Sequence, residues 1–139
     1  MAKRYTIFDH TADLGVEIYG KTLPELFANA AFAVFDIITD LRFVKAAEER
    51  QVVIDGSGWE DLLVNYLREI LYLFNGEGLL LKEYSIGKIA PYNLEANVSG
   101  EHFDPVHHRI NAEIKAVTYH QISVRETPDG WTGRVIFDV

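Results

Sequence analysis

Hydrophobic residues near the start of the chain alternate with polar ones, as they do in strands that are buried on one face. Leu14, Val16 and Ile18 occupy every second position, which is the side-chain period of a β-strand. The segment Tyr5-Thr6-Ile7 before them has the composition of a short first strand. We therefore expect two strands joined by the loop 8–13.

Two longer segments follow the helical period instead. The first opens with Thr22 and has Glu25 three residues later, a pair that can cap a helix start. The second opens with Ser57 and Glu60 in the same arrangement, and Gly76 is suited to end it. The two apolar stripes are Leu23, Phe27, Ala30, Ala31, Val34 and Ile38, and Trp59, Leu62, Leu63, Tyr66, Leu67, Ile70, Leu71 and Phe74.

The remaining pattern is that of strands. It predicts them at residues 51–55, 79–89, 94–99 and 110–120, and a hairpin of 121–127 with 131–139 through the turn 128–130. Helices with one apolar stripe each need a sheet to cover. We predict an α+β fold in which two helices pack on one face of a mostly antiparallel or mixed β-sheet. The whole chain, residues 1–139, is expected to be a single domain.

The amino-acid composition excludes several kinds of functional site. The 139 residues are 48% hydrophobic and include no cysteine, which excludes disulfides, thiolate zinc sites and cysteine nucleophiles. No signal-peptide pattern opens the sequence, and no apolar run is long enough to span a bilayer. We expect a cytoplasmic protein with no membrane contact.

The charge balance bears on nucleic-acid binding. The chain has 13 basic and 21 acidic residues, for a formal net charge of -8. Proteins that bind nucleic acid directly usually gather basic residues on one face, because phosphate contacts dominate their affinity. The sequence shows no such cluster, so any link to RNA is expected to run through a partner protein.

Two carboxylates and an imidazole lie within the five residues Asp9-His10-Thr11-Ala12-Asp13. A loop between two strands can bring such groups to one point, and a hard cation such as calcium binds several oxygen ligands in irregular geometry. A polar turn, in which Asp9 and Thr11 bond to neighbouring backbone N–H groups, explains the same residues. Spacing alone favours the polar turn, and the cation site stays open as an alternative.

The end of the chain offers a second group of anions. Asp138 and the terminal carboxylate of Val139 are one residue apart, at the end of an apolar strand. A bound cation would neutralise them. Alternatively, Asp138 points to solvent and the strand end is simply well packed.

Two other groups of polar side chains give weaker indications of a functional site. The segment from Lys115 to His120 carries an amine, a hydroxyl, a phenol and an imidazole, which an ordinary strand with one polar face explains. His102, His107 and His108 lie in or near the loop 101–109. A zinc site there would need a geometry that spacing does not supply, so we expect solvated loop histidines.

Three segments taken together resemble the archease family. They are Asp9-His10-Thr11-Ala12-Asp13-Leu14-Gly15, Lys115-Ala116-Val117-Thr118-Tyr119-His120 and Phe137-Asp138-Val139. They stand at the start, the late middle and the end of a chain whose length fits the whole family domain. Their order and placement make the resemblance specific, although the first segment alone would be weak.

The resemblance implies an accessory protein, not an enzyme. Its partner would be an RtcB-type GTP-dependent RNA ligase, whose guanylylation and multiple turnover it promotes in tRNA splicing and RNA repair. RNA would be met only through the ligase. An older proposal for the family is a chaperone-like modulator of a tRNA methyltransferase.

The resemblance also implies a bound metal, usually described as calcium (Ca2+). By position, its ligands would be Asp13, Asp138 and Val139, the last through its main chain. Asp13 and the end of the chain must then be neighbours in space. A different use of the same residues is a metal-dependent hydrolase in which Asp13 and Asp138 activate water, with His10 or His120 as the base.

With the metal ligands assigned in this way, the neighbouring polar residues become supporting or partner-facing. They are Asp9, His10, Thr11, Lys115 and His120. The polar groups beyond the two aspartates show no clear catalytic spacing, which favours the accessory protein over the hydrolase.

Overall fold

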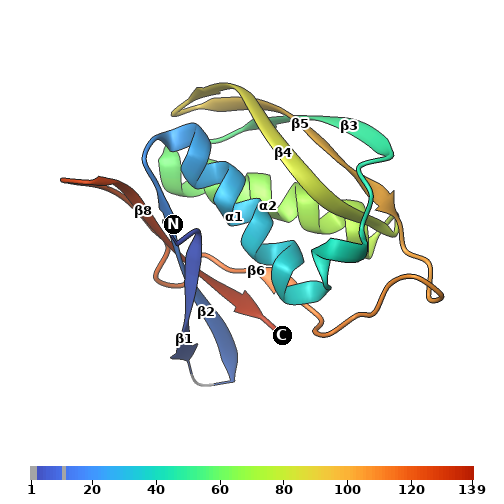
Figure 1. Cartoon of the computed structure of the whole chain (residues 1–139). Coiled ribbons are helices and arrows are strands. Elements are labelled where there is room, and N and C mark those ends of the chain that lie inside the picture. Colours follow the sequence, from blue (N-terminus) through green and yellow to red (C-terminus); the bar gives the residue numbers. More distant parts are fainter. Residues whose placement is uncertain (1–2, 11) are drawn as a thin grey trace.

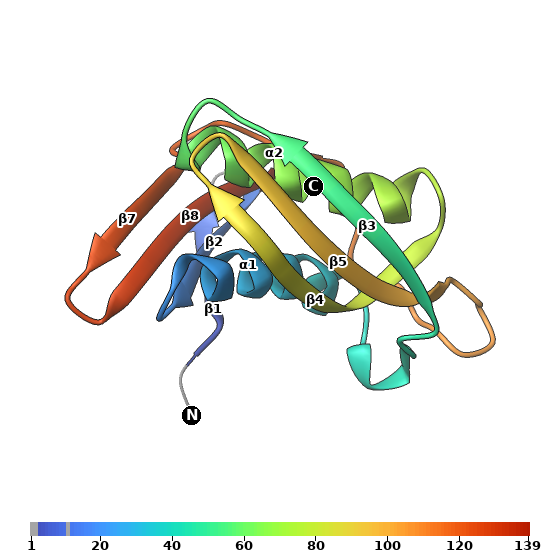
Figure 2. The ribbon, with the colours of Figure 1, turned by 90° about the horizontal axis from the view of Figure 1, so that it is seen from above.

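The computed structural model describes residues 3–10 and 12–139, except for the side chains of Asp9 and His10. Within these residues, two α-helices form a layer between a five-stranded and a three-stranded sheet (Figures 1 and 2). The five-stranded sheet contains β1 (Tyr5–His10), β2 (Asp13–Gly20), β6 (Ala116–Val117), β7 (Ser123–Thr127) and β8 (Gly130–Asp138). The three-stranded sheet contains β3 (Glu48–Asp55), β4 (Leu79–Ala90) and β5 (Asn93–His102).

The strand order shows how a sheet comes to cover the helix layer on each of its two sides. The order is β1-β2-β8-β6 in the larger sheet, with β7 also paired to β8, and β3-β5-β4 in the smaller one. All of these pairs are antiparallel. Helix α1 (Leu23–Ile38) packs against β2 on one side and β4 on the other. The α+β class with antiparallel sheets is therefore confirmed, and the strands divide into two sheets where the pattern predicted one.

Helix α1 starts as the sequence predicts. The Thr22 side chain accepts the backbone N–H of Glu25 at 3.2 Å. Pro24 lies in the first turn, where a missing N–H leaves no helical bond unmade. The apolar stripe of α1 is fully buried at Phe27 and Val34.

Helix α2 (Trp59–Asn75) starts differently from the prediction. Its N-cap is Gly58, which has a φ of 148° and makes no side-chain cap. Ser57 does not cap the helix but donates its N–H to the Asp61 carboxylate at 2.9 Å and its hydroxyl at 3.1 Å. The predicted pairing of Ser57 with Glu60 is therefore wrong, because the carboxylate one residue further along receives the bonds.

The segment before β6 also departs from the prediction. A strand was expected over residues 110–120, but the strand is only Ala116–Val117, and Ile110 makes an isolated bridge to Thr39. The carbonyl of Ile114 accepts the side-chain N–H of Asn75 on α2 at 3.0 Å. At Ile114, the hydrogen bond that a neighbouring strand would make is therefore made by a side chain of α2.

The core is one continuous hydrophobic cluster that joins both sheets to the helices. It includes Val16 and Ile18 of β2, Phe137 of β8 and Leu94 of β5, each at most 1% exposed. No helix in the part of the chain described is both long enough and apolar enough to cross a lipid bilayer.

Candidate functional site

The start of β2 and the end of β8 meet at one end of the five-stranded sheet (Figure 1). Asp13 is the register partner of Asp138, and the next pair is Leu14 with Phe137. Phe137 belongs to the core, so the two aspartates lie on the face turned away from the helices. Side chains directly opposite one another in such a pair have Cβ atoms about 4.5–5.5 Å apart. The structure therefore brings Asp13 beside the end of the chain, and we call Asp13, Asp138 and Val139 the acidic tip.

The predicted segment 115–120 lies along the other side of β8. The Lys115 N–H donates to the Asp138 carbonyl at 2.8 Å, and Ala116 is the register partner of Asp138. Thr118 donates both its N–H, at 3.2 Å, and its hydroxyl, at 2.8 Å, to the Ile136 carbonyl. Lys115 is thus next to the acidic tip, whereas His120 lies further on, in the turn toward β7.

The predicted loop 8–13 is wrong at both ends, because strand pairing continues further than the pattern showed: β1 extends to His10 and β2 begins at Asp13. The backbone of His10 is opposite Asp13, and that of Asp9 is opposite Leu14. Ala12 has a φ of 61°, a left-handed conformation that costs a non-glycine residue about 1 kcal/mol. Thr11 lies outside the described residues, so its supporting role stays a prediction, as do the roles of the Asp9 and His10 side chains.

An aromatic ring occupies the outer face next to the acidic tip. Phe8 of β1 is the register partner of Gly15, and its ring lies so close that a Cβ on Gly15 would approach it to 2.3 Å. The Arg134 guanidinium is 4.2 Å from the centroid of this ring, a cation–π distance. Gly15 therefore provides the space in which the Phe8 ring crosses β2, a role that the sequence pattern did not reveal.

The donor chemistry of the acidic tip fits a hard divalent cation. Calcium takes carboxylate and main-chain oxygen ligands in flexible geometry, and Asp13 and Asp138 supply two carboxylates from facing positions. Asp138 and Val139 are exposed. Among the described residues, no three or more histidine or acidic side chains are grouped closely enough to hold a metal ion. Main-chain oxygens, water or a partner would have to complete the coordination.

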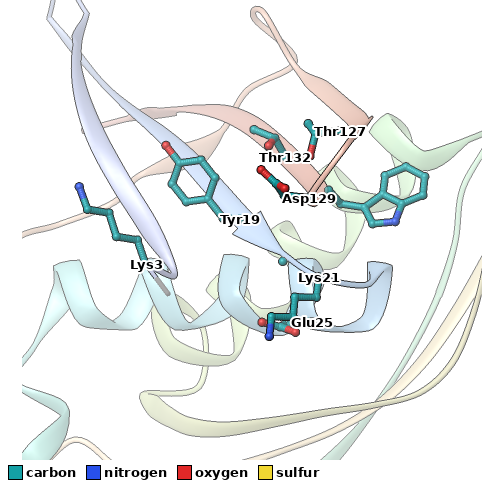
Figure 3. A pocket seen from close by; sticks show the side chains of 9 residues that line it. Lys3, Tyr19, Lys21, Glu25, Thr127, Asp129 and Thr132 are labelled. Carbon is teal, nitrogen blue, oxygen red and sulfur yellow. The ribbon is translucent and has the colours of Figure 1, made fainter. Parts of the chain in front are cut away.

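A hollow of about 570 Å³ lies at the opposite end of β2 and β8. Figure 3 shows Lys3 and Tyr19 on one side of it and Thr127, Asp129 and Thr132 of the β7–β8 hairpin on the other. At about 3.3 Å per strand residue, Tyr19 is roughly 20 Å from Asp13. None of the residues predicted for the site lines this hollow.

One loop histidine is not solvated, contrary to prediction. The His108 side chain is 1% exposed, and its Nε2 lies 2.7 Å from the Glu101 carboxylate. Its Nδ1 accepts the Asp104 N–H at 2.9 Å, so the N–H that the ring offers to Glu101 is the one on Nε2. This hydrogen bond lowers the pKa of Glu101. The prediction was wrong for His108 because its partners are set by the folded loop and not by its neighbours in sequence.

Replacing His108 by alanine is expected to lower the free energy of unfolding by about 1–3 kcal/mol, because the Asp104 N–H would lose its acceptor inside the protein. The adjacent His107 has a side chain that is 71% exposed, so His107→Ala is expected to change stability by less than about 0.5 kcal/mol. Urea unfolding of both variants measures the difference. Equal losses would show that the Asp104–His108–Glu101 network contributes nothing specific.

Comparison with known proteins supports the family resemblance that the three sequence segments indicated. Residues 5–139 match the archease protein family (MTH1598/TM1083). The chain is similar to protein archease of Methanosarcina barkeri (strain Fusaro / DSM 804), with 37% identity over 141 residues, 99% of this chain and 97% of the relative. It is also 37% identical over 142 residues to protein archease of Pyrococcus abyssi (strain GE5 / Orsay), covering 99% of both chains. The chain belongs to the archease family.

Solved structures show the same fold. The solution structure of Methanobacterium thermoautotrophicum protein 1598 superposes with a TM-score of 0.83 at 36% identity, over 98% of this chain and 99% of that one. The crystal structure of an archease from Thermotoga maritima, described as a possible chaperone, gives a TM-score of 0.68 at 22% identity, over 100% of this chain and 98% of that one. At that identity the second likeness shows the fold alone.

Proposed function

We propose that this protein is a metal-binding accessory factor for an RtcB-type GTP-dependent RNA ligase. In this proposal it promotes guanylylation of the ligase and its multiple turnover in tRNA splicing and RNA repair, acts in the cytoplasm, and does not join RNA itself. The observation that carries the proposal is the pairing of Asp13 with Asp138 at an exposed sheet end, beside Lys115. All three segments that resemble the family meet there.

The acidic tip would hold Ca2+ through the carboxylates of Asp13 and Asp138 and a main-chain oxygen of Val139. A bound divalent cation supplies positive charge that can attract phosphate oxygens and stabilise the closely spaced carboxylates. The protein's own part is to fix these oxygens at the end of a paired sheet, where a partner can approach. The formal net charge of -8 supports contact with a ligase in preference to RNA directly.

A guanylylation assay tests this function. Ligase, labelled GTP and divalent metal are mixed with the wild-type protein or with Asp13→Ala, and label on the ligase is followed over time. We expect stimulation by the wild type and at least a tenfold smaller stimulation by the variant, since altering even the surroundings of a metal ligand costs about 10–100-fold. Asp129→Ala is the matched control, because it removes the same charge at the far end of the sheet.

The guanylylation assay and two related activity assays distinguish the candidate functions. If the wild-type protein does not stimulate the ligase, the proposal is wrong. A metal-dependent hydrolase built on Asp13 and Asp138, with His10 or His120 as its base, would hydrolyse nucleotide or phosphoester without any ligase. A chaperone-like modulator of a tRNA methyltransferase would stimulate that enzyme equally well with Asp13→Ala, provided that the acidic tip has no part in it.

A further inference from the structure

Three polar side chains of α2 bind the chain segment 114–119, which lies between this helix and β8. The Asp61 carboxylate accepts the Tyr119 hydroxyl at 2.5 Å. The Arg68 guanidinium donates Nε–H and an Nη–H to the Val117 carbonyl at 3.2 and 3.1 Å. The Asn75 amide donates to the Ile114 carbonyl at 3.0 Å. We call Asp61, Arg68 and Asn75 the α2 clamp.

The spacing of the α2 clamp matches the segment that it holds. Its members recur every seven residues, about two helical turns, so they share one face of α2. At 1.5 Å per residue, the helix from Asp61 to Asn75 covers about 21 Å. An extended chain from Tyr119 back to Ile114 covers about 17 Å. The segment therefore runs antiparallel to α2 and is hydrogen-bonded to it near both ends and in the middle.

Arg68 contacts the middle of the segment through both hydrogen bonds and an aromatic ring. It gives two N–H groups to one carbonyl, and its guanidinium carbon lies 4.8 Å from the centroid of the Tyr119 ring. Guanidinium groups combine forked donation with stacking on aromatic faces, which an ammonium group does less well. The Tyr119 hydroxyl in turn lowers the pKa of Asp61, the next member of the clamp.

The opposite side of the same segment is bonded to the end of β8. Lys115 donates its N–H to the Asp138 carbonyl, and Val117 pairs with Phe137. The backbone of residues 111–115 belongs to no strand. The position of Lys115 beside Asp138 thus depends on the short β6 pairing and on the side chains of α2.

We propose that Arg68, supported by Asn75, is a positioning residue for the acidic tip. Through the Val117 carbonyl it holds residues 115–117 against β8, and this keeps Asp138 opposite Asp13. Arg68 does not touch the metal ligands itself. The inference extends the proposed function, because the consequence for calcium binding rests on the acidic tip being the metal centre.

Amide hydrogen exchange tests the positioning directly, with the Lys115 amide as reporter because it bonds to the Asp138 carbonyl. In Arg68→Met we expect this amide to exchange at least tenfold faster, as the loss of one or two net hydrogen bonds implies, while amides in β3 and β5 keep their protection. Arg68→Lys should recover part of the protection. Asn75→Ala, at the last residue of α2, is a milder second variant that keeps helix propensity.

Calcium titration calorimetry of the same variants tests the consequence. Arg68→Met should bind calcium about tenfold more weakly than the wild type. Arg50→Met is the matched control, because Arg50 also donates to a backbone carbonyl, that of Glu49 in the other sheet. It should leave both the Lys115 exchange and the calcium affinity unchanged.

The outcomes separate the two proposals. Unchanged Lys115 exchange in both Arg68→Met and Asn75→Ala would overturn the positioning role. Faster exchange with unchanged calcium affinity would show that the clamp does not serve the metal centre, while the proposed function stands. If the wild-type protein binds no calcium, the proposed metal centre fails, and Lys115 exchange alone decides whether Arg68 positions the strand end.

Discussion

Asparagine in place of Asp13 or Asp138 is expected to lower calcium affinity by about two orders of magnitude or more. Each substitution removes one of the two side-chain carboxylates that face each other across β2 and β8. Ligand charge is a main determinant of calcium affinity, and even changes that only reorient a metal ligand cost 10–100-fold. Asparagine keeps the size of the side chain, so the strands should pair as before. Calorimetric titration with calcium chloride measures the effect.

The terminal residue gives a sharper version of this test. If Val139 binds through its main chain, Val139→Ala should bind calcium as the wild type does, whereas deletion of Val139 should weaken binding. Asp129→Asn at the far end of the sheet is the charge-matched control and should have no effect. Unchanged affinity on deletion of Val139 would remove it from the ligand set, and unchanged affinity in Asp138→Asn would do the same for Asp138.

Gly100→Ala is expected to be the most damaging small substitution in the three-stranded sheet, with a loss of about 3 kcal/mol in the free energy of unfolding. Gly100 lies in β5 between Glu48 of β3 and Leu81 of β4. A Cβ at this position would be 1.7 Å from the Leu80 carbonyl oxygen. That oxygen belongs to the backbone, so the clash can be relieved only by moving a strand.

Gly87→Ala in β4 is the matched control and should act in the opposite direction. Its added Cβ would meet only the Glu95 carbonyl oxygen, at an ordinary 3.6 Å. Where the backbone tolerates it, alanine is more stable than glycine by about 0.4–1 kcal/mol, chiefly because the unfolded chain loses freedom. Urea unfolding of both variants should therefore show opposite signs. A loss for Gly100→Ala no larger than 0.5 kcal/mol would mean that β4 and β5 adjust freely at this point.

The helices could be predicted from the sequence because their signals are local. The apolar stripe of α1 and the Thr22 cap lie within a few residues of one another, and both are confirmed. The start of α2 was predicted less accurately, since Asp61 and not the expected Glu60 receives the hydrogen bonds of Ser57. Both candidates lie within four residues of Ser57, and only the folded turn decides between them.

The division into two sheets could not be predicted, because an alternating strand looks the same in either. Val16 of β2 and Val52 of β3 are both buried against the helices, although they belong to different sheets. The pairing of β2 with β8 joins distant parts of the chain and has no local signal. The proximity of Asp13 to Asp138 was expected from the family resemblance, and the strand register supplied the geometry.

The sequence did not reveal the roles of Arg68 and Asn75, because their partners are distant in the chain. Arg68 bonds to a backbone carbonyl 49 residues away, and a carbonyl has no sequence identity to recognise. The seven-residue spacing of Asp61, Arg68 and Asn75 was visible, but a solvated helix face shows the same pattern. The spacing indicates a shared face and not what that face binds.

The place of β8 in its sheet has a consequence for the order of folding. This strand pairs with β2, β6 and β7, yet it is synthesised after all of them. The three-stranded sheet and both helices are complete in the chain before β8 exists. Strand β2 can pair with β1 at once, but its second partner, β8, lies across a long loop whose closure carries an entropic cost. The acidic tip is therefore expected to form late in folding. A polypeptide that stops short of β8 could retain much of the helical core and still have no site to present to a partner.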